Sequence, residues 1–204
     1  MKNRISAEFE GPMLPFMAFC IALNLTVGQV AATLKIPVYL DSLGTILLAV
    51  LSGPWSAIVA GALSNLLAAA IGNPPMVFFI PAVVVIGAFT GIVARMGWFR
   101  RMPTVVLGGI LLGIPAAALS ALISASVFGG VTMGGSDFIV LFFRSRGFSL
   151  YQSTLFQGFI MDPVDKLITY LIVFALVRSL PSRLLQRFPG AGNVRLQTND
   201  PDAS

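Results

Sequence analysis

Uninterrupted apolar runs separated by short breaks are the dominant pattern along this chain of 204 residues. The runs lack the apolar–polar alternation of membrane β-barrel strands, so they predict helices. A helix needs about 20 apolar residues to cross a hydrocarbon core about 30 Å thick. Six runs approach that length: Met13–Leu34, Pro37–Leu51, Pro54–Ile71, Met76–Ala94, Thr104–Phe128 and Pro163–Leu180. We therefore predict an all-α integral membrane protein with six transmembrane helices.

The breaks between runs, and the two ends, define a single domain. Gly53-Pro54 predicts a tight turn after the second run, and Gly72-Asn73-Pro74-Pro75 separates the third run from the fourth. Residues 1–12 form a cytoplasmic N-terminal segment, and residues 13–188 form the six-helix substrate-binding domain. Residues 189–204 are polar and contain Gly, Asn and Asp, so we expect a disordered cytoplasmic tail.

The connection between the fifth and sixth runs, residues 129–162, is too long for a simple turn. Its segment Ser136–Phe143 is apolar enough to lie in the membrane interface or to fold over the bundle as a cap. Gly129-Gly130 and Gly134-Gly135 are candidate hinges. An ordered loop without gating explains the pattern equally well, because glycine pairs are common in turns.

Composition supports the membrane assignment, and charge placement gives an orientation. Hydrophobic residues make up 56% of the chain and charged residues only 10%, whereas a soluble domain carries roughly a quarter charged residues. With both termini in the cytoplasm, nine of the 13 Lys and Arg lie inside and three outside, with Lys166 near a boundary. The net charge of +5 is thus explained by topology in a bacterial cell membrane, with no need for nucleic acid.

Polar side chains within or beside the runs are the first candidates for a site, because an ionisable group inside a membrane is costly unless it is paired or faces a cavity. Asp41 falls in the second run, and the charged residues Asp162, Asp165 and Lys166 lie at the start of the sixth. We predict an outward-facing pocket for a small polar or aromatic molecule. The candidate substrate-binding residues are Asn24, Gln29, Tyr39, Asp41, Asn65, Asn73, Asp162, Asp165 and Lys166.

Structural roles compete with ligand binding at several of these positions. Asp162-Pro163 is typical of a helix start, with Asp162 as N-cap, and this interpretation is favoured for Asp162. Lys166 has the spacing to pair with Asp162. Asp165 and Lys166 diverge by about 100° around a helix, so one of them should face the bundle. The amides of the first and third runs are equally suited to interhelical hydrogen bonds, and Tyr39 to anchoring at the interface.

Small residues spaced by four recur on three predicted helices and allow close helix packing. The pairs are Ala18 and Ala22, Ala57 and Gly61, and Gly87 and Gly91. Internal packing is the favoured interpretation, and docking of a partner helix is the alternative.

The sequence lacks the residues that several kinds of catalysis and ligand binding require. The sequence has no histidine, one cysteine (Cys20) and no Gly-x-x-x-x-Gly-Lys-Ser/Thr phosphate loop. A Ser-His or Cys-His catalytic arrangement, a typical zinc site and ATP binding through such a loop are therefore not expected. We predict a protein that is not an enzyme and that binds neither a cofactor nor a metal.

Five features together resemble the substrate-binding S components of energy-coupling factor vitamin transporters. They are Ala18-x-x-x-Ala22, the stretch Pro37–Thr45, Gly53-Pro54-Trp55, Asn65, and Asp162-Pro163-Val164-Asp165-Lys166. The resemblance implies capture of a micronutrient from outside and association with a transmembrane coupling protein and two cytoplasmic ATPases. It also implies that Ala18 and Ala22 dock to the coupling protein. It does not identify the vitamin or precursor, because members share a scaffold and differ in their loops.

Two alternatives remain open on the residues alone. A self-sufficient secondary transporter would use Asp41 or Asp165 as a proton site. A membrane scaffolding protein would bind no small ligand, and its charged residues within the membrane would then have no evident use.

Overall fold

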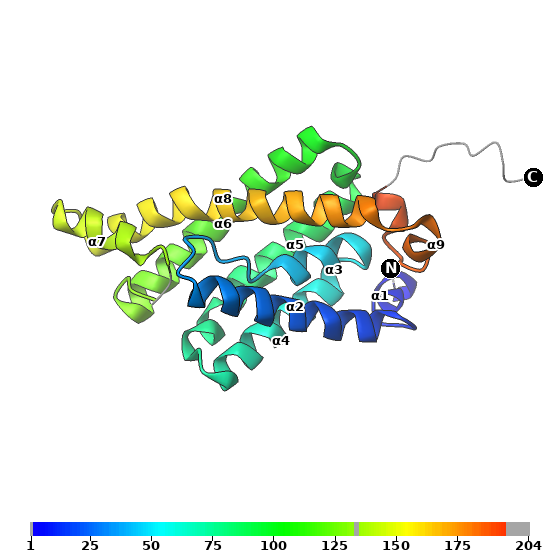
Figure 1. Ribbon diagram of the computed structural model, residues 1–204, viewed down its shortest axis with the longest axis horizontal. Helices are drawn as coiled ribbons and strands as arrows, with labels where there is room; N and C mark the ends of the chain where they lie inside the picture. Colours follow the sequence, from blue (N-terminus) through cyan, green and yellow to red (C-terminus); the bar gives the residue numbers. More distant parts are fainter. Residues whose placement is uncertain (1, 133–134, 195–204) are drawn as a thin grey trace, which may run out of the picture.

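Helices account for every regular element in the part of the chain that the computed structural model describes, residues 2–132 and 135–194. Figure 1 shows their arrangement. The α-helices are α1 (Lys2–Ala7), α2 (Met13–Thr33), α3 (Leu43–Leu51), α4 (Pro54–Ile71), α5 (Ile80–Arg95), α6 (Met102–Phe128), α7 (Asp137–Ser145), α8 (Leu150–Ser179) and α9 (Ser182–Leu185). Short 3₁₀ turns are Pro74–Phe79, Trp98–Arg100 and Ala191–Asn193. The all-helical prediction is confirmed for these residues.

Four helical segments are long and apolar enough to cross a membrane: Met13–Thr33, Pro54–Ile71, Pro74–Arg95 and Met102–Phe128. Their outer faces carry large apolar side chains that water would disfavour. Phe19, Leu66 and Leu122 are 56%, 45% and 55% exposed. Together these helices give the chain the character of a multi-pass membrane protein.

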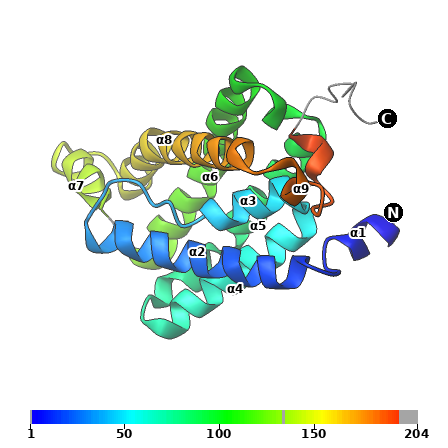
Figure 2. The same ribbon diagram turned by 45° about the vertical axis from the view of Figure 1, so that its right-hand side comes forward.

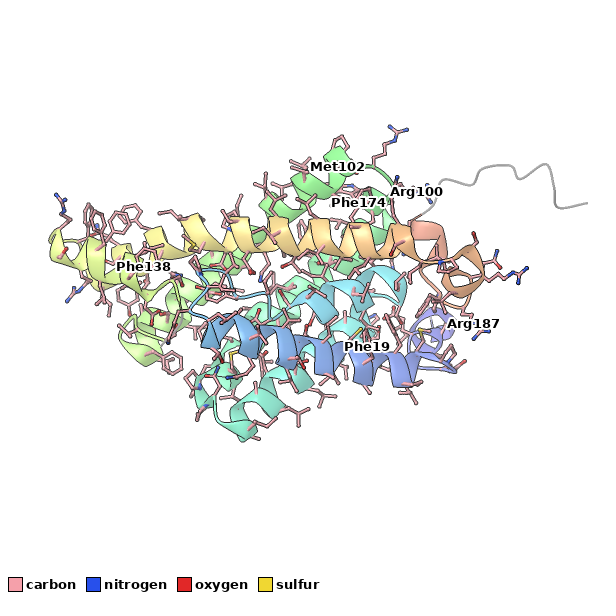
Figure 3. All side chains as sticks on the ribbon, in the orientation of Figure 1. Phe19, Arg100, Met102, Phe138, Phe174 and Arg187 are labelled. Carbon is pink, nitrogen blue, oxygen red and sulfur yellow. The ribbon has the colours of Figure 1, made fainter. Side chains whose placement is uncertain are left out.

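The bundle has two distinct ends. α1 and α9 lie at one end, and α7 lies at the other, as both ribbon views show (Figures 1 and 2). Side chains follow the same division, with Arg187 at the α9 end and Phe138 on α7 at the opposite end (Figure 3). Phe138 and Leu141 are 60% and 58% exposed, whereas Ile139 and Val140 of the same helix are buried. α7 is therefore amphipathic.

The second predicted span, Pro37–Leu51, is wrong in its first half. Residues 34–42 form an irregular segment, in which Lys35 and Leu40 both have a φ of 53°, and helix α3 begins only at Leu43. Left-handed backbone cannot continue a right-handed helix. All nine residues of α3 are buried, so this helix, about 14 Å long, forms the centre of the core.

The predicted start of the sixth span at Pro163 is also wrong. α8 begins 13 residues earlier, at Leu150, where Ser149 and Gln152 form a capping box. Asp162 is therefore not an N-cap, and Pro163 lies inside the helix. The proline is accommodated at the contact with α6, because a Cβ on Gly113 would overlap the Pro163 backbone. Residues 150–162, predicted as loop, belong to this helix.

The structure describes part of the predicted glycine hinges and part of the predicted C-terminal tail. Gly129 has a φ of 62° and ends α6 as a left-handed cap, which explains Gly129-Gly130 without a hinge. Gly134 lies outside the described residues. Residues 189–194, expected in a disordered tail, instead pack on α3, where the Gly190 N–H donates to the Leu51 carbonyl at 2.7 Å. The rest of the predicted tail, 195–204, lies outside the described residues.

Two of the three small-residue pairs have the packing role favoured from the sequence. A Cβ on Gly87 would meet the backbone of Ala57 and Ile58, and one on Gly91 would meet the backbone of Pro54. These contacts bring α4 and α5 close together. Ala18 and Ala22 differ, because both lie on the exposed side of α2.

Glu8, for which no role was predicted from the sequence, joins α4 to α5 at the α1 end of the bundle. Its side chain is 1% exposed. Oε2 accepts hydrogen bonds from the backbone N–H groups of Trp55 and Ser56 at 2.8 and 3.0 Å, and Oε1 pairs with Arg95 at 2.5 Å. The carboxylate thus caps the positive N-terminal end of α4 and links it to the end of α5.

Candidate ligand cavity

A cavity of about 800 Å³ opens between α2, the 34–42 segment, α4, α5, α6 and α8. Ligand sites for drug-sized molecules span about 300–1,000 Å³. The cavity lies toward the α7 end, because the last turns of α2, α4 and α6 line it together with Gln157 near the start of α8. Eight of the nine residues predicted from the sequence line it: Asn24, Gln29, Tyr39, Asp41, Asn65, Asn73, Asp162 and Lys166.

Asp165, the ninth predicted residue, lies behind the cavity wall and holds the 34–42 segment in place. It is fully buried, and its Oδ1 accepts hydrogen bonds from the backbone N–H groups of Tyr39 and Leu40 at 2.9 and 2.8 Å. Its Oδ2 pairs with Lys166 at 2.6 Å. Lys166 also donates to Ser42 Oγ at 3.0 Å. The lysine therefore pairs with Asp165, and not with Asp162, which the sequence spacing offered as its partner.

Asn24 joins three helices through both ends of its amide. Nδ2 donates to Thr45 Oγ1 at 2.9 Å and to Ser64 Oγ at 3.1 Å. Oδ1 accepts from the Gly44 N–H at 2.7 Å, at the start of α3. These are the interhelical hydrogen bonds that the sequence offered as an alternative to ligand binding, and they position the short helix α3 beside the cavity.

The other three amides differ in burial: Asn65 is as buried as Asn24, whereas Gln29 and Asn73 are exposed. Asn65 donates to the Met76 carbonyl at 3.1 Å and so ties α4 to the turn that follows it. Gln29 contacts Thr33 at 3.4 Å within α2 and is exposed. Asn73 is exposed in the connection before the Pro74–Phe79 turn. Gln29 and Asn73 therefore lie at the rim of the cavity.

Tyr39, Ser136 and Gln157 form a hydrogen-bonded cluster that joins the 34–42 segment, the start of α7 and α8. The Tyr39 and Ser136 hydroxyl groups are 2.9 Å apart, and Gln157 Nε2 donates to them at 2.5 and 2.8 Å respectively. Ser136 and Gln157 are not among the binding residues predicted from the sequence. The Ser149-Leu150-Tyr151-Gln152 capping box was the available signal, because it extends α8 far enough to bring Gln157 into the bundle.

Asp162 differs from every other polar residue of the site. It is 3% exposed and lines the cavity, yet its Oδ2 is buried with no hydrogen-bond partner among the described residues. Asp41 lines the same cavity and packs on α2, where a Cβ on Gly28 would lie 3.0 Å from Asp41 Cβ. Two carboxylates therefore border the space.

Apolar side chains also line the cavity, among them Met76, Phe79, Val83 and Ile86. A cavity lined by both apolar and acidic side chains suits non-covalent binding of a small amphipathic molecule. No group of three or more His, Cys, Asp or Glu side chains suited to a metal ion occurs within residues 2–132 and 135–194.

Comparisons with protein-family models, with characterised proteins and with solved structures find no match to this chain.

Proposed function

We propose that this chain is the substrate-capturing membrane subunit of an importer of the energy-coupling factor type, and that it takes up a vitamin or related micronutrient. The cavity is the observation that carries the proposal. Polar side chains from α2, the 34–42 segment, α4 and α8 border a space of about 800 Å³ that a small molecule would fill.

The proposal places six crossings in the membrane, with both termini in the cytoplasm. Four helical segments are long and apolar enough to cross. α8 has 30 residues, about 45 Å, and its charged side chains Asp162, Asp165 and Lys166 are buried, whereas Arg178 in its last turn is exposed. The second crossing would be made by α3 together with the irregular 34–42 segment, in which the backbone N–H groups of Tyr39 and Leu40 are bonded to Asp165. The cavity then opens to the outside.

Energy would come from other chains. The sequence contains no phosphate-binding loop of the Gly-x-x-x-x-Gly-Lys-Ser/Thr type. In the family that the chain resembles, a coupling protein and two ATPases supply this function. Ala18 and Ala22 lie exposed on α2, away from the cavity, which supports their role as the surface that meets the coupling protein.

The proposal is tested by ligand recovery and by reconstituted uptake. Gently purified protein should retain a small molecule that mass spectrometry identifies, and a vitamin panel should contain at least one compound that raises the melting temperature. Liposomes with this chain alone should not concentrate that compound, whereas liposomes that also contain the coupling protein and ATPases should. Absence of any retained or stabilising compound would refute the proposal.

A proton-coupled secondary transporter is the second candidate, favoured by the position of Asp41 and Asp162 on the cavity wall. Asp165 is less suited to this role than the sequence suggested, because Lys166 and two backbone N–H groups already occupy both of its carboxylate oxygens, and it does not line the cavity. This candidate predicts that a pH gradient alone drives uptake into liposomes that contain only this chain.

A further inference from the structure

The partnerless oxygen of Asp162 is the feature of the cavity that packing does not explain. A buried carboxylate is costly without hydrogen bonds, and native proteins leave few such atoms unsatisfied. The other buried acids, Glu8 and Asp165, each accept two backbone hydrogen bonds and pair with a cation. Asp162 is the exception, and it borders the cavity.

The charges around the cavity favour one sign of ligand. Two carboxylates, Asp41 and Asp162, line the cavity together with the buried ammonium group of Lys166, and the carboxylate of Asp165 lies behind the wall. Asp165 at 2.6 Å and Ser42 at 3.0 Å already occupy that ammonium. Lys35 also lines the cavity, but it is exposed, and water screens its charge. An anion entering here would meet two carboxylates and compete with Asp165 for Lys166.

We infer that the cavity takes a ligand whose positively charged nitrogen group, an amine, amidine or protonated heterocycle, pairs with the carboxylate of Asp162. Rotation about the Cβ–Cγ bond brings either oxygen to the cavity side. Asp41 adds a second acceptor in the cavity lining, and the side chains of Met76, Phe79 and Ile86 receive the apolar part of the ligand. This inference rests on the proposed function, since it names the chemical class that the capture subunit would select.

A matched set of fragments tests the charge preference directly. Benzamidine, benzyl alcohol and benzoate share a ring and differ in charge, so their binding to the purified full-length protein isolates the charge. We expect benzamidine to raise the melting temperature and benzoate to leave it unchanged. Asp162→Asn should weaken benzamidine binding about tenfold or more, because a charge-assisted hydrogen bond is lost. Asp41→Asn should weaken it less, because Asp41 is partly exposed.

The stability of the ligand-free protein separates this role from a structural one. Asp162→Asn removes a buried charge whose Oδ2 has no hydrogen-bond partner among the described residues, so the melting temperature without ligand should stay equal or rise. A structural carboxylate would give a lower one. Glu10→Gln, which removes an exposed carboxylate on the segment before α2, is the matched control and should change neither quantity.

Three outcomes would overturn the inference: tighter binding of benzoate than of benzamidine, unchanged benzamidine affinity in Asp162→Asn, or no stabilisation by any of the three fragments. A retained natural ligand that proves neutral or anionic would also overturn it, yet would leave the capture function intact. Absence of any retained or stabilising micronutrient would instead contradict the capture function itself.

Discussion

Lys166 and Asp165 are neighbours in the chain, and both are buried, with Lys166 Nζ 2.6 Å from Asp165 Oδ2. Adjacent residues diverge by about 100° around a helix, so both can be buried only where other parts of the chain cover α8 over a wide arc. The 34–42 segment supplies that cover. It donates two backbone hydrogen bonds to Asp165 and lies beside Lys166 through Ser42. One ion pair thus fixes the segment that carries Tyr39 and Asp41 to the cavity.

Removing the lysine should be costly. Lys166→Met leaves the buried Asp165 carboxylate without its cation, which we expect to lower the free energy of unfolding by about 3–5 kcal/mol. Chemical denaturation in detergent measures the change. The double variant Asp165→Asn/Lys166→Met removes both charges and should recover part of the loss. Wild-type stability in Lys166→Met would show that the pair does not hold the segment.

Glu8→Gln should loosen the α1 end of the bundle. The substitution removes the charge that faces the α4 N-terminus and the ion pair with Arg95, whose side chain is 41% exposed. We expect a loss of about 1–2 kcal/mol in the free energy of unfolding and faster amide exchange at Trp55 and Ser56. Glu10→Gln removes an exposed carboxylate two residues away and should leave both measurements unchanged.

Gly113→Ala should separate α6 from α8. The added Cβ would overlap the Pro163 backbone, which cannot move away as a flexible side chain would. We expect destabilisation of about 1–3 kcal/mol, measured by thermal unfolding in detergent. Gly192→Ala is the control, since nothing lies within 4 Å of a Cβ at that position. Equal melting temperatures for the two variants would contradict the tight α6–α8 contact.

Bulky residues on the exposed α2 face should disrupt assembly without affecting capture. Ala18→Leu and Ala22→Leu lie away from the cavity, so the melting-temperature increase caused by a bound micronutrient should persist. Co-purification with a coupling protein should fall, because close helix approach needs small side chains. Ala70→Leu, at an exposed position on α4, is the control. Full recovery of the complex with both α2 variants would exclude this face as the docking surface.

The extent of the apolar helices could be read from the sequence. A run of about 20 apolar residues is energetically committed to a helix in the membrane, because its backbone groups can be satisfied only within the segment. The predicted ranges for the first, third and fifth runs accordingly lie close to α2, α4 and α6. Gly87 and Gly91 were likewise correctly given a packing role, since small residues spaced by four permit close helix contact.

Helix boundaries could not be predicted from the sequence where tertiary contacts overrode the local signal. Asp162-Pro163 is a strong helix-start signal, yet Ser149 caps α8 earlier and Gly113 makes room for Pro163 within the helix. The Pro37–Leu51 run is apolar throughout most of its length, but only Leu43–Leu51 is helical. Tertiary bonds from Asp165, 126 residues from Tyr39 in the chain, hold the preceding segment irregular.

The sequence by itself determined that polar groups of the right kinds would gather among apolar helices, because a membrane leaves such groups few places to go. Eight of the nine predicted residues line one cavity. Only the tertiary structure decided their individual roles. Asn24 and Asp165 form hydrogen bonds with neighbouring helices and segments, whereas Asp162 has a buried oxygen with no hydrogen-bond partner in the part of the chain that the structure describes. That difference depends on which atoms lie within 3 Å or so of each side chain, and such proximity arises only when distant segments pack together.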